Sequence, residues 1–124
     1  SFPTRRSSDL GMLEQCRRMH DHIGAENIEC MLKDANDLDY RQLGPAGAVI
    51  NCSLTDMDGT DWFTHIPDGT IVVMQARDHD PGYQFDSPDD ILAKFPLDTV
   101  YYKGSKQLKD PETKYNRFMV IGRK

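Results

Sequence analysis

The chain has 124 residues, 38% hydrophobic and 28% charged, a length that allows one domain and excludes two. The balance of 15 basic and 20 acidic residues gives a net charge of −5 with no Lys/Arg stripe beyond Arg17 and Arg18, so we find no strong nucleic-acid signal and expect small or cationic partners. The longest apolar runs have the length of strands, far short of the roughly 20 residues of a membrane span, so no membrane partner is expected.

The first ten residues differ from the rest of the chain. Residues 1–10, SFPTRRSSDL, show no hydrophobic periodicity and match the translation of a sequencing-library adapter letter for letter. This resemblance predicts a non-native segment at 1–10, a domain over 11–124, and a gene cut short on its 5′ side. The alternative is a genuine basic arm in which Arg5 and Arg6 contact phosphate.

The next part of the chain is predicted to alternate between helix and strand. Apolar residues recur every three or four positions in 12–23, which indicates an amphipathic helix, and Gly24 follows as a helix stop. Residues 27–32, NIECML, are predicted to form a short strand that leads into an acidic turn at Asp34 and Ala35.

Two continuous apolar runs, 46–52 and 70–75, are predicted to be strands buried on both faces of a parallel sheet. A short helix over 58–66, with its large apolar residues on one side, is predicted between them. This alternation indicates βαβ units with right-handed crossovers.

The C-terminal part changes character. A Ser-Pro-Asp-Asp sequence predicts a helix from residue 88 to about 94. Two strands are predicted over 97–104 and 115–122, and because no helix separates them they must be antiparallel neighbours.

The three cysteines, Cys16, Cys30 and Cys52, form an odd set without metal-binding spacing. Such a set is more typical of free thiols in a reducing compartment than of a disulfide framework. The sequence therefore predicts a cytoplasmic location.

Several segments together carry a resemblance to a known family. They are the triplet Asn51-Cys52-Ser53, the segment WFTHIPDGT at 62–70, Gln75 in the following strand, and the C-terminal YNRFMVIGRK. The chain resembles class I S-adenosylmethionine-dependent methyltransferases over 11–124, and in particular a small group from bacteria and phages. The resemblance implies an α/β fold: a partial Rossmann-like methyltransferase fold with a mostly parallel sheet ending in an antiparallel C-terminal hairpin. The chain departs from such relatives at Thr55 and Asp56, where they carry an acidic residue and a histidine.

The resemblance also implies site residues, which would follow the strands because ligands bind beyond the carboxyl ends of an open α/β sheet. Asp34 would accept a hydrogen bond from the adenine amine of S-adenosylmethionine while the Ala35 N–H approaches a ring nitrogen; the alternative is a solvated acid. Asn51 and Ser53 would orient the methyl acceptor as catalytic residues, with Asn51 and Cys52 also contacting the cofactor. The alternative for Asn51 is that it satisfies backbone groups at the strand end.

Other constellations have simpler interpretations. Cys52 beside His65 or His79 would form a thiol nucleophile and base, but a buried thiol is commoner. Residues 78–80, Asp-His-Asp, resemble metal ligands, yet adjacent side chains diverge, so we predict no metal site and a solvated loop. The aromatic residues of 83–85 are either part of a lid or loop anchors.

Two parts of a methyltransferase are not found: the glycine-rich cofactor loop and the acidic residue that binds the ribose. The sequence therefore predicts a C-terminal fragment, inactive alone, whose truncated sheet edge favours self-association. The methyl acceptor is not identifiable. Two alternatives stay open, a non-catalytic α/β binding or assembly module and an enzyme that transfers another carbon of the same cofactor.

Overall fold

The computed structural model divides the chain into two compact units, Ser1–Asp34 and Ala35–Lys124. It describes residues 3–24, 26–41, 47–79 and 85–124, with the backbone alone for 3–9. Within these residues, no helix is both long enough and apolar enough to cross a membrane.

The first unit is built on one long helix, α1 (Pro3–Ile23). It ends as predicted, because Gly24 follows with a φ of +67°, a conformation that glycine adopts without strain. It begins at Pro3, nine residues before the predicted start. A proline is compatible with this position, because a residue in the first turn of a helix needs no partner for its backbone N–H. That residues 1–10 are non-native stays a prediction.

The segment after α1 corrects two expectations. Residues 27–32 form no strand in the described part of the first unit, because a lone extended segment has no neighbour to pair with. Cys16 and Cys30 are joined in a disulfide, and Cys52 alone is free. The prediction of three free thiols was wrong, since spacing along the chain does not reveal that the backbone returns beside α1. The cytoplasmic location based on it stays a prediction.

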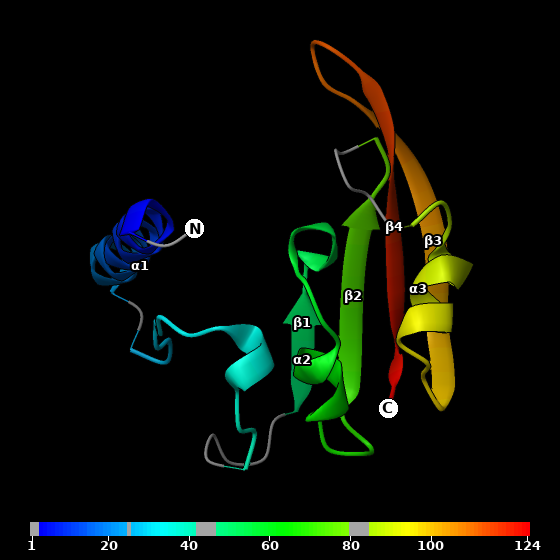
Figure 1. Cartoon of the computed structure of the whole chain (residues 1–124), viewed down its shortest axis with the longest axis horizontal. Helices are drawn as coiled ribbons and strands as arrows, with labels where there is room; N and C mark the ends of the chain where they lie inside the picture. The colour runs from blue at the N-terminus through cyan, green and yellow to red at the C-terminus, as the bar shows by residue number, and fades with distance from the viewer. Residues whose placement is uncertain (1–2, 25, 42–46, 80–84) are drawn as a thin grey trace. The chain divides into compact units, whose positions relative to one another are not determined.

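The second unit contains a four-stranded mixed sheet with the order β1-β2-β4-β3 (Figure 1). Its strands are β1 (Ala48–Asn51), β2 (Ile71–Arg77), β3 (Thr99–Lys109) and β4 (Lys114–Arg123). β1 and β2 are parallel, whereas β4 is antiparallel to both β2 and β3. The predicted hairpin is therefore confirmed, but the expected mostly parallel sheet is wrong, because β4 turns back after β3 and inserts between it and β2.

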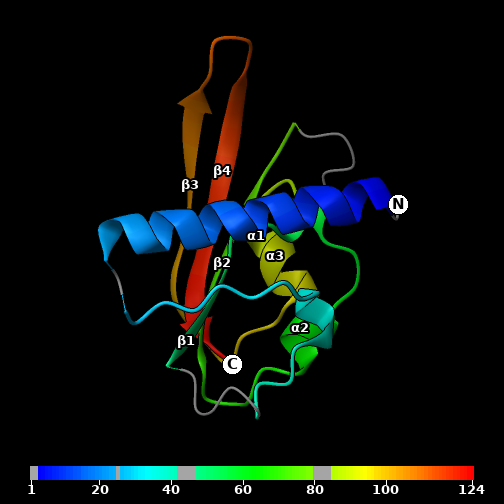
Figure 2. The ribbon, with the colours of Figure 1, turned by 90° about the vertical axis from the view of Figure 1, so that its left-hand side faces the viewer.

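Short helices cover one side of this sheet. α2 (Asp61–Thr64) and α3 (Pro88–Lys94) lie on the same face (Figure 2). α3 has the predicted bounds, and the Ser87 hydroxyl caps it by accepting a hydrogen bond from the Asp90 N–H at 3.3 Å. On the far side of β1 no strand is paired within the described residues, so self-association through this edge stays a prediction.

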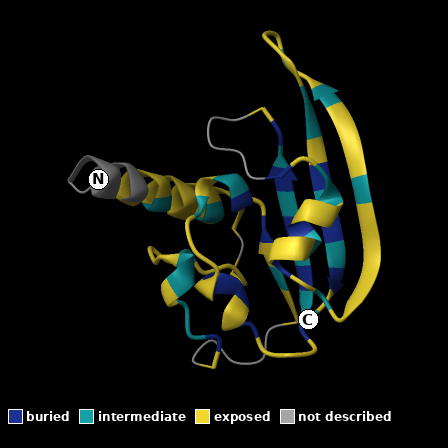
Figure 3. Cartoon of the chain, turned by 45° about the vertical axis from the view of Figure 1, so that its right-hand side comes forward, coloured by how far each residue is buried: buried dark blue, intermediate teal, exposed yellow. Residues whose placement is uncertain are grey.

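The two faces of the sheet are buried to different extents, because buried and partly exposed residues alternate along β2 and β4 (Figure 3). We call the side that carries Val72 and Val120, both 0% exposed, the core face. The opposite side, which carries Val73 and Ile121, is the open face. Burial alternates along β2, and Ile50 on the open face of β1 is 67% exposed. The prediction of strands buried on both faces was wrong, because the helices of this unit cover one face only.

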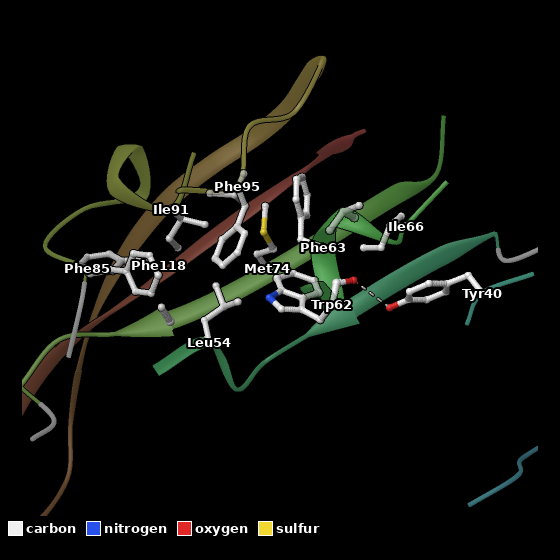
Figure 4. Packing of buried hydrophobic residues seen from close by; sticks show 13 residues of the cluster. Tyr40, Leu54, Trp62, Phe63, Ile66, Met74, Phe85, Ile91, Phe95 and Phe118 are labelled. Carbon is white, nitrogen blue, oxygen red and sulfur yellow. Dashed lines mark hydrogen bonds between the residues drawn. The ribbon is translucent and has the colours of Figure 1, made fainter. Parts of the chain in front are cut away.

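An aromatic cluster forms the centre of the core (Figure 4). The ring of Trp62 lies 5.7 Å from that of Phe63 and 5.0 Å from that of Phe95, both in edge-to-face arrangements. The Tyr40 hydroxyl donates a hydrogen bond to the Trp62 carbonyl at 3.4 Å. The expected apolar side of the helix over 58–66 is thus confirmed, although α2 is shorter than predicted. Phe85, 1% exposed, also packs in this core and is an anchor, whereas Tyr83 lies outside the described residues.

Candidate functional site

The carboxyl ends of the two parallel strands define the candidate site. Asn51 at the end of β1 is paired with Met74, so β2 continues three residues further, to Arg77. Cys52 and Ser53 follow β1, and the dipeptide Asp78-His79 follows β2. Because both strands run in the same direction, these groups lie at one edge of the sheet, where α/β domains bind ligands.

The side chain of Asn51 is engaged locally. It is 9% exposed, and its Oδ1 accepts a hydrogen bond from the Ser53 N–H at 2.9 Å. Its Nδ2 donates to the Met57 sulfur at 3.1 Å, a weak acceptor. Asn51 therefore satisfies backbone at the strand end, as the simpler interpretation proposed, and the remaining capacity of its amide is small. A catalytic role for Asn51 stays a prediction.

The two residues after Asn51 face solvent. Cys52 is exposed and free, and Ser53 is exposed with no side-chain cap on the short 3-10 helix that follows, η2 (Leu54–Asp56). Within the described residues, no hydrogen bond joins the Cys52 thiol to His65 or His79, so the thiol–imidazole pair is not assembled in this structure. The hydroxyl of Ser53 remains a group that could orient a bound molecule.

The polar arrangement with the most hydrogen bonds at this edge is one that sequence reasoning missed. The carboxylate of Asp78 accepts hydrogen bonds from the Asn116 backbone N–H at 2.7 Å and from its Nδ2 at 2.9 Å. In return, the Asp78 N–H donates to the Asn116 carbonyl at 3.1 Å. These bonds fasten the end of β2 to β4 and hold the carboxylate in place.

Asp78 in turn orients His79. The Nδ1 of His79 lies 2.7 Å from Oδ1 of Asp78, and the His79 side chain is 59% exposed. His79 has a φ of +64°, the one positive φ among the described non-glycine residues, a conformation that costs free energy and often marks functional positions. With Nδ1 held by a carboxylate, Nε2 has no partner among the described residues. Such an imidazole could accept a proton from a bound molecule.

The electrostatics of Asp78 reflect these contacts. Burial raises the pKa of Asp78, but the hydrogen bonds from His79 and from the side chain and backbone of Asn116 outweigh this effect. Together they hold the pKa of Asp78 below its ordinary value. Asp78 is thus a fixed anion beside His79 under ordinary conditions.

The residues expected to contact adenine fall on either side of the division between the units. Asp34 is exposed and ends the first unit, whereas Ala35 begins η1 (Ala35–Asp37) of the second unit and packs against the core. The neighbouring Asn36 donates to the Asp58 carbonyl at 2.8 Å and accepts from the Trp62 N–H at 3.0 Å. Ala35 is therefore held on a segment that is fastened to the start of α2.

The described residues contain no group of three or more acidic, His or Cys side chains arranged to hold a metal ion. Asp80, the third member of the metal-like sequence at 78–80, lies outside the described residues. In comparisons with known proteins, no protein-family model, curated protein or solved structure matches the chain.

Proposed function

We propose that the chain is part of a Rossmann-like methyltransferase domain that transfers a methyl group from S-adenosylmethionine to an acceptor still to be identified. The observation that carries this proposal is the strand order β1-β2-β4-β3, with the last strand antiparallel between β2 and β3. A final strand inserted in this way is what the resemblance to class I methyltransferases implies. The resemblance of residues 49–75 adds to it, because the same segment ends β1 and forms β2.

The groups at the carboxyl edge are compatible with such chemistry. S-adenosylmethionine supplies an electrophilic methyl group on a sulfonium. In this proposal Ala35, Asn51 and Cys52 contact the cofactor. The exposed Ser53 hydroxyl orients the acceptor, and methyl transfer is favoured by alignment. His79, held by Asp78, accepts the proton that a neutral acceptor must lose. The nine glycines of the chain form no glycine-rich loop that could hold the methionine moiety of the cofactor. We therefore expect the chain alone to bind the cofactor weakly and to show no turnover.

One observation favours a second candidate, a non-catalytic α/β binding or assembly module. The Asn51 amide is already engaged by Ser53 and Met57, which leaves little of it for an acceptor. The oriented His79 favours the enzyme, because an imidazole held by a carboxylate is the arrangement that general-base catalysis uses.

A titration of the ¹⁵N-labelled chain with S-adenosylhomocysteine tests the proposal. We expect amide shifts at Ala35 and at Asn51–Ser53 at about 1 mM ligand, the range in which a ligand bound by about 4 kcal/mol half-saturates its site. The Cys52→Ala variant should reduce these shifts, because Cys52 contacts the cofactor in this proposal and is exposed and free. Ser105→Ala on β3 is the matched control. A dispersed spectrum that does not respond to the ligand would contradict the proposal and favour the binding module.

A further inference from the structure

The charges of this chain are unevenly distributed over its elements. The four strands together contain seven Lys or Arg residues and no Asp or Glu, in a chain in which acidic residues outnumber basic ones. The acidic residues that the structure describes lie in helices, turns and connecting segments. The sheet is therefore a positively charged part of an acidic protein.

Three of these cations form a row across the open face. Strand register places Arg77 of β2 opposite Arg117 of β4, and Arg117 opposite Lys106 of β3. Since directly opposed residues share a face, all three side chains project from the open face. Arg117 and Lys106 are exposed. Like charges in opposed positions are unfavourable, so the row is not explained by the stability of the sheet.

Arg77 has contacts of its own beside this row. Its guanidinium lies 5.2 Å from the centre of the Tyr115 ring. Hydrogen bonds from the backbone N–H groups of Thr113 and Glu112 are the main causes that lower the pKa of Asp110, and desolvation opposes them. The positive charge of Arg77 is the smallest cause that lowers this pKa. One carboxylate at the hairpin turn therefore lies near one end of the row.

An aromatic platform lies next to the cations. A Cβ atom on Gly104 would come within 2.7 Å of Cζ of Tyr102, so the Tyr102 ring lies across the space that a side chain at position 104 would fill. One side of the ring thus rests on the sheet, and the residue is 51% exposed. Gly104 and Lys106 are two residues apart on β3, which separates platform and row by about 7 Å.

We propose that the open face binds single-stranded nucleic acid, with phosphates on the Arg77–Arg117–Lys106 row and a base stacked on Tyr102. Cationic side chains that follow the backbone, combined with aromatic rings for stacking, are the general means of binding single strands. A second copy of the chain is a poorer partner, because a two-fold contact of this face would bring the two cation rows together. An acidic peptide would satisfy the cations, but it leaves the flat ring of Tyr102 without a stacking partner. This inference is independent of the proposed methyl transfer.

Fluorescence anisotropy of a labelled oligothymidylate of about 12 nucleotides tests the proposal with the whole chain. At about 50 mM salt we expect binding below about 100 µM protein, weakening with salt at a log–log slope near −2 for three phosphates. Lys106→Gln with Arg117→Gln should abolish most of the slope. Lys103→Gln is the matched control, because Lys103 lies on the same strand but on the core face, opposite Val120. Tyr102→Ala should weaken binding about fivefold or more, the loss of one stacked base.

Several outcomes would overturn the proposal. They are no binding by the folded chain, binding that the double variant leaves unchanged, and a poly-glutamate competitor that displaces the oligonucleotide while Tyr102→Ala has no effect. Self-association that the double variant strengthens, measured by sedimentation, would show that the face is an interface between copies. Circular dichroism of each variant checks the fold, and amide shifts of the unaltered chain with oligothymidylate locate the contact without any substitution.

Discussion

The core face and the open face of the sheet share the same strands but have different roles. On β2 and β4, Val72 and Val120 are fully buried under the helices, whereas Val73 and Ile121, opposite each other on the other side, remain partly exposed. The two pairs have nearly the same β-branched chemistry. Burial on β2 and β4 is thus decided by what covers a face and not by the residue types that line it.

The largest expected effect is on the free energy of unfolding, and it compares the two faces through substitutions at adjacent residues of β4. Phe118→Ala, on the core face and 3% exposed, should lower the free energy of unfolding by about 3–5 kcal/mol because it leaves a cavity. Met119→Ala, on the open face, should cost less than half as much. Urea denaturation followed by circular dichroism measures both. Equal losses would show that the open face is also packed.

The second effect concerns the buried polar end of the core face. Asp78→Asn should cost about 1–3 kcal/mol, because the bonds from Asn116 and His79 lose a charged acceptor. The folded pKa of Asp78 is lowered, so its contribution to stability is present above its ordinary pKa and is lost as the pH falls through the folded value. The free energy of unfolding should therefore fall less steeply with decreasing pH in Asp78→Asn than in the unaltered chain. Asp68→Asn in an exposed turn is the control. If Asp78→Asn left the pH dependence of unfolding in acid unchanged, the lowered pKa of Asp78 in the folded chain would be contradicted.

Substitution of Gly104 should have a smaller effect on the free energy of unfolding but a clear effect on the binding of oligothymidylate. A methyl group there displaces the Tyr102 ring, whose far end can move, so Gly104→Ala should change the free energy of unfolding by less than about 1 kcal/mol. Oligothymidylate binding should nevertheless weaken, because the ring no longer lies flat on the sheet. A variant that binds as tightly as the unaltered chain would remove Tyr102 from the contact.

The smallest effect is expected from an ion pair on the exposed edge of the core face. Lys103 Nζ lies 2.7 Å from a carboxylate oxygen of Asp89, and both side chains are more than half exposed. Lys103→Gln should cost at most about 1 kcal/mol, since surface pairs gain little over their hydration. Thermal unfolding at low and high salt measures it, and a cost of several kcal/mol would mean that β3 depends on α3 more than the exposure suggests.

Local signals predicted much of the fold correctly. Ser87 and Pro88 determine where α3 begins, and Gly24 determines where α1 ends, because caps act through neighbouring backbone groups. The apolar runs were sufficient to find β1 and β2. The same local reasoning failed for residues 27–32, because a strand exists only where another strand pairs with it.

The candidate site was predictable in part. The strand ends at Asn51–Ser53 follow from the apolar runs, and their location at one edge follows from parallel pairing. The bond between Asp78 and Asn116 spans 38 residues and depends on β4 lying beside β2, which no spacing in the sequence reveals. The orientation of His79 follows from that bond, so sequence reasoning could not distinguish it from a solvated loop residue.

The sequence by itself thus determined the end of α1, the bounds of α3, the strands β1 and β2 and the hairpin, since each depends on residues close together along the chain. Tertiary structure alone decided the mixed sheet, the uncovered face, the Cys16–Cys30 disulfide and the cation row. Arg77, Lys106 and Arg117 are dispersed in an acidic sequence and form no basic stretch. They become neighbours because strand register aligns three segments on one face, and register is a property of the folded sheet.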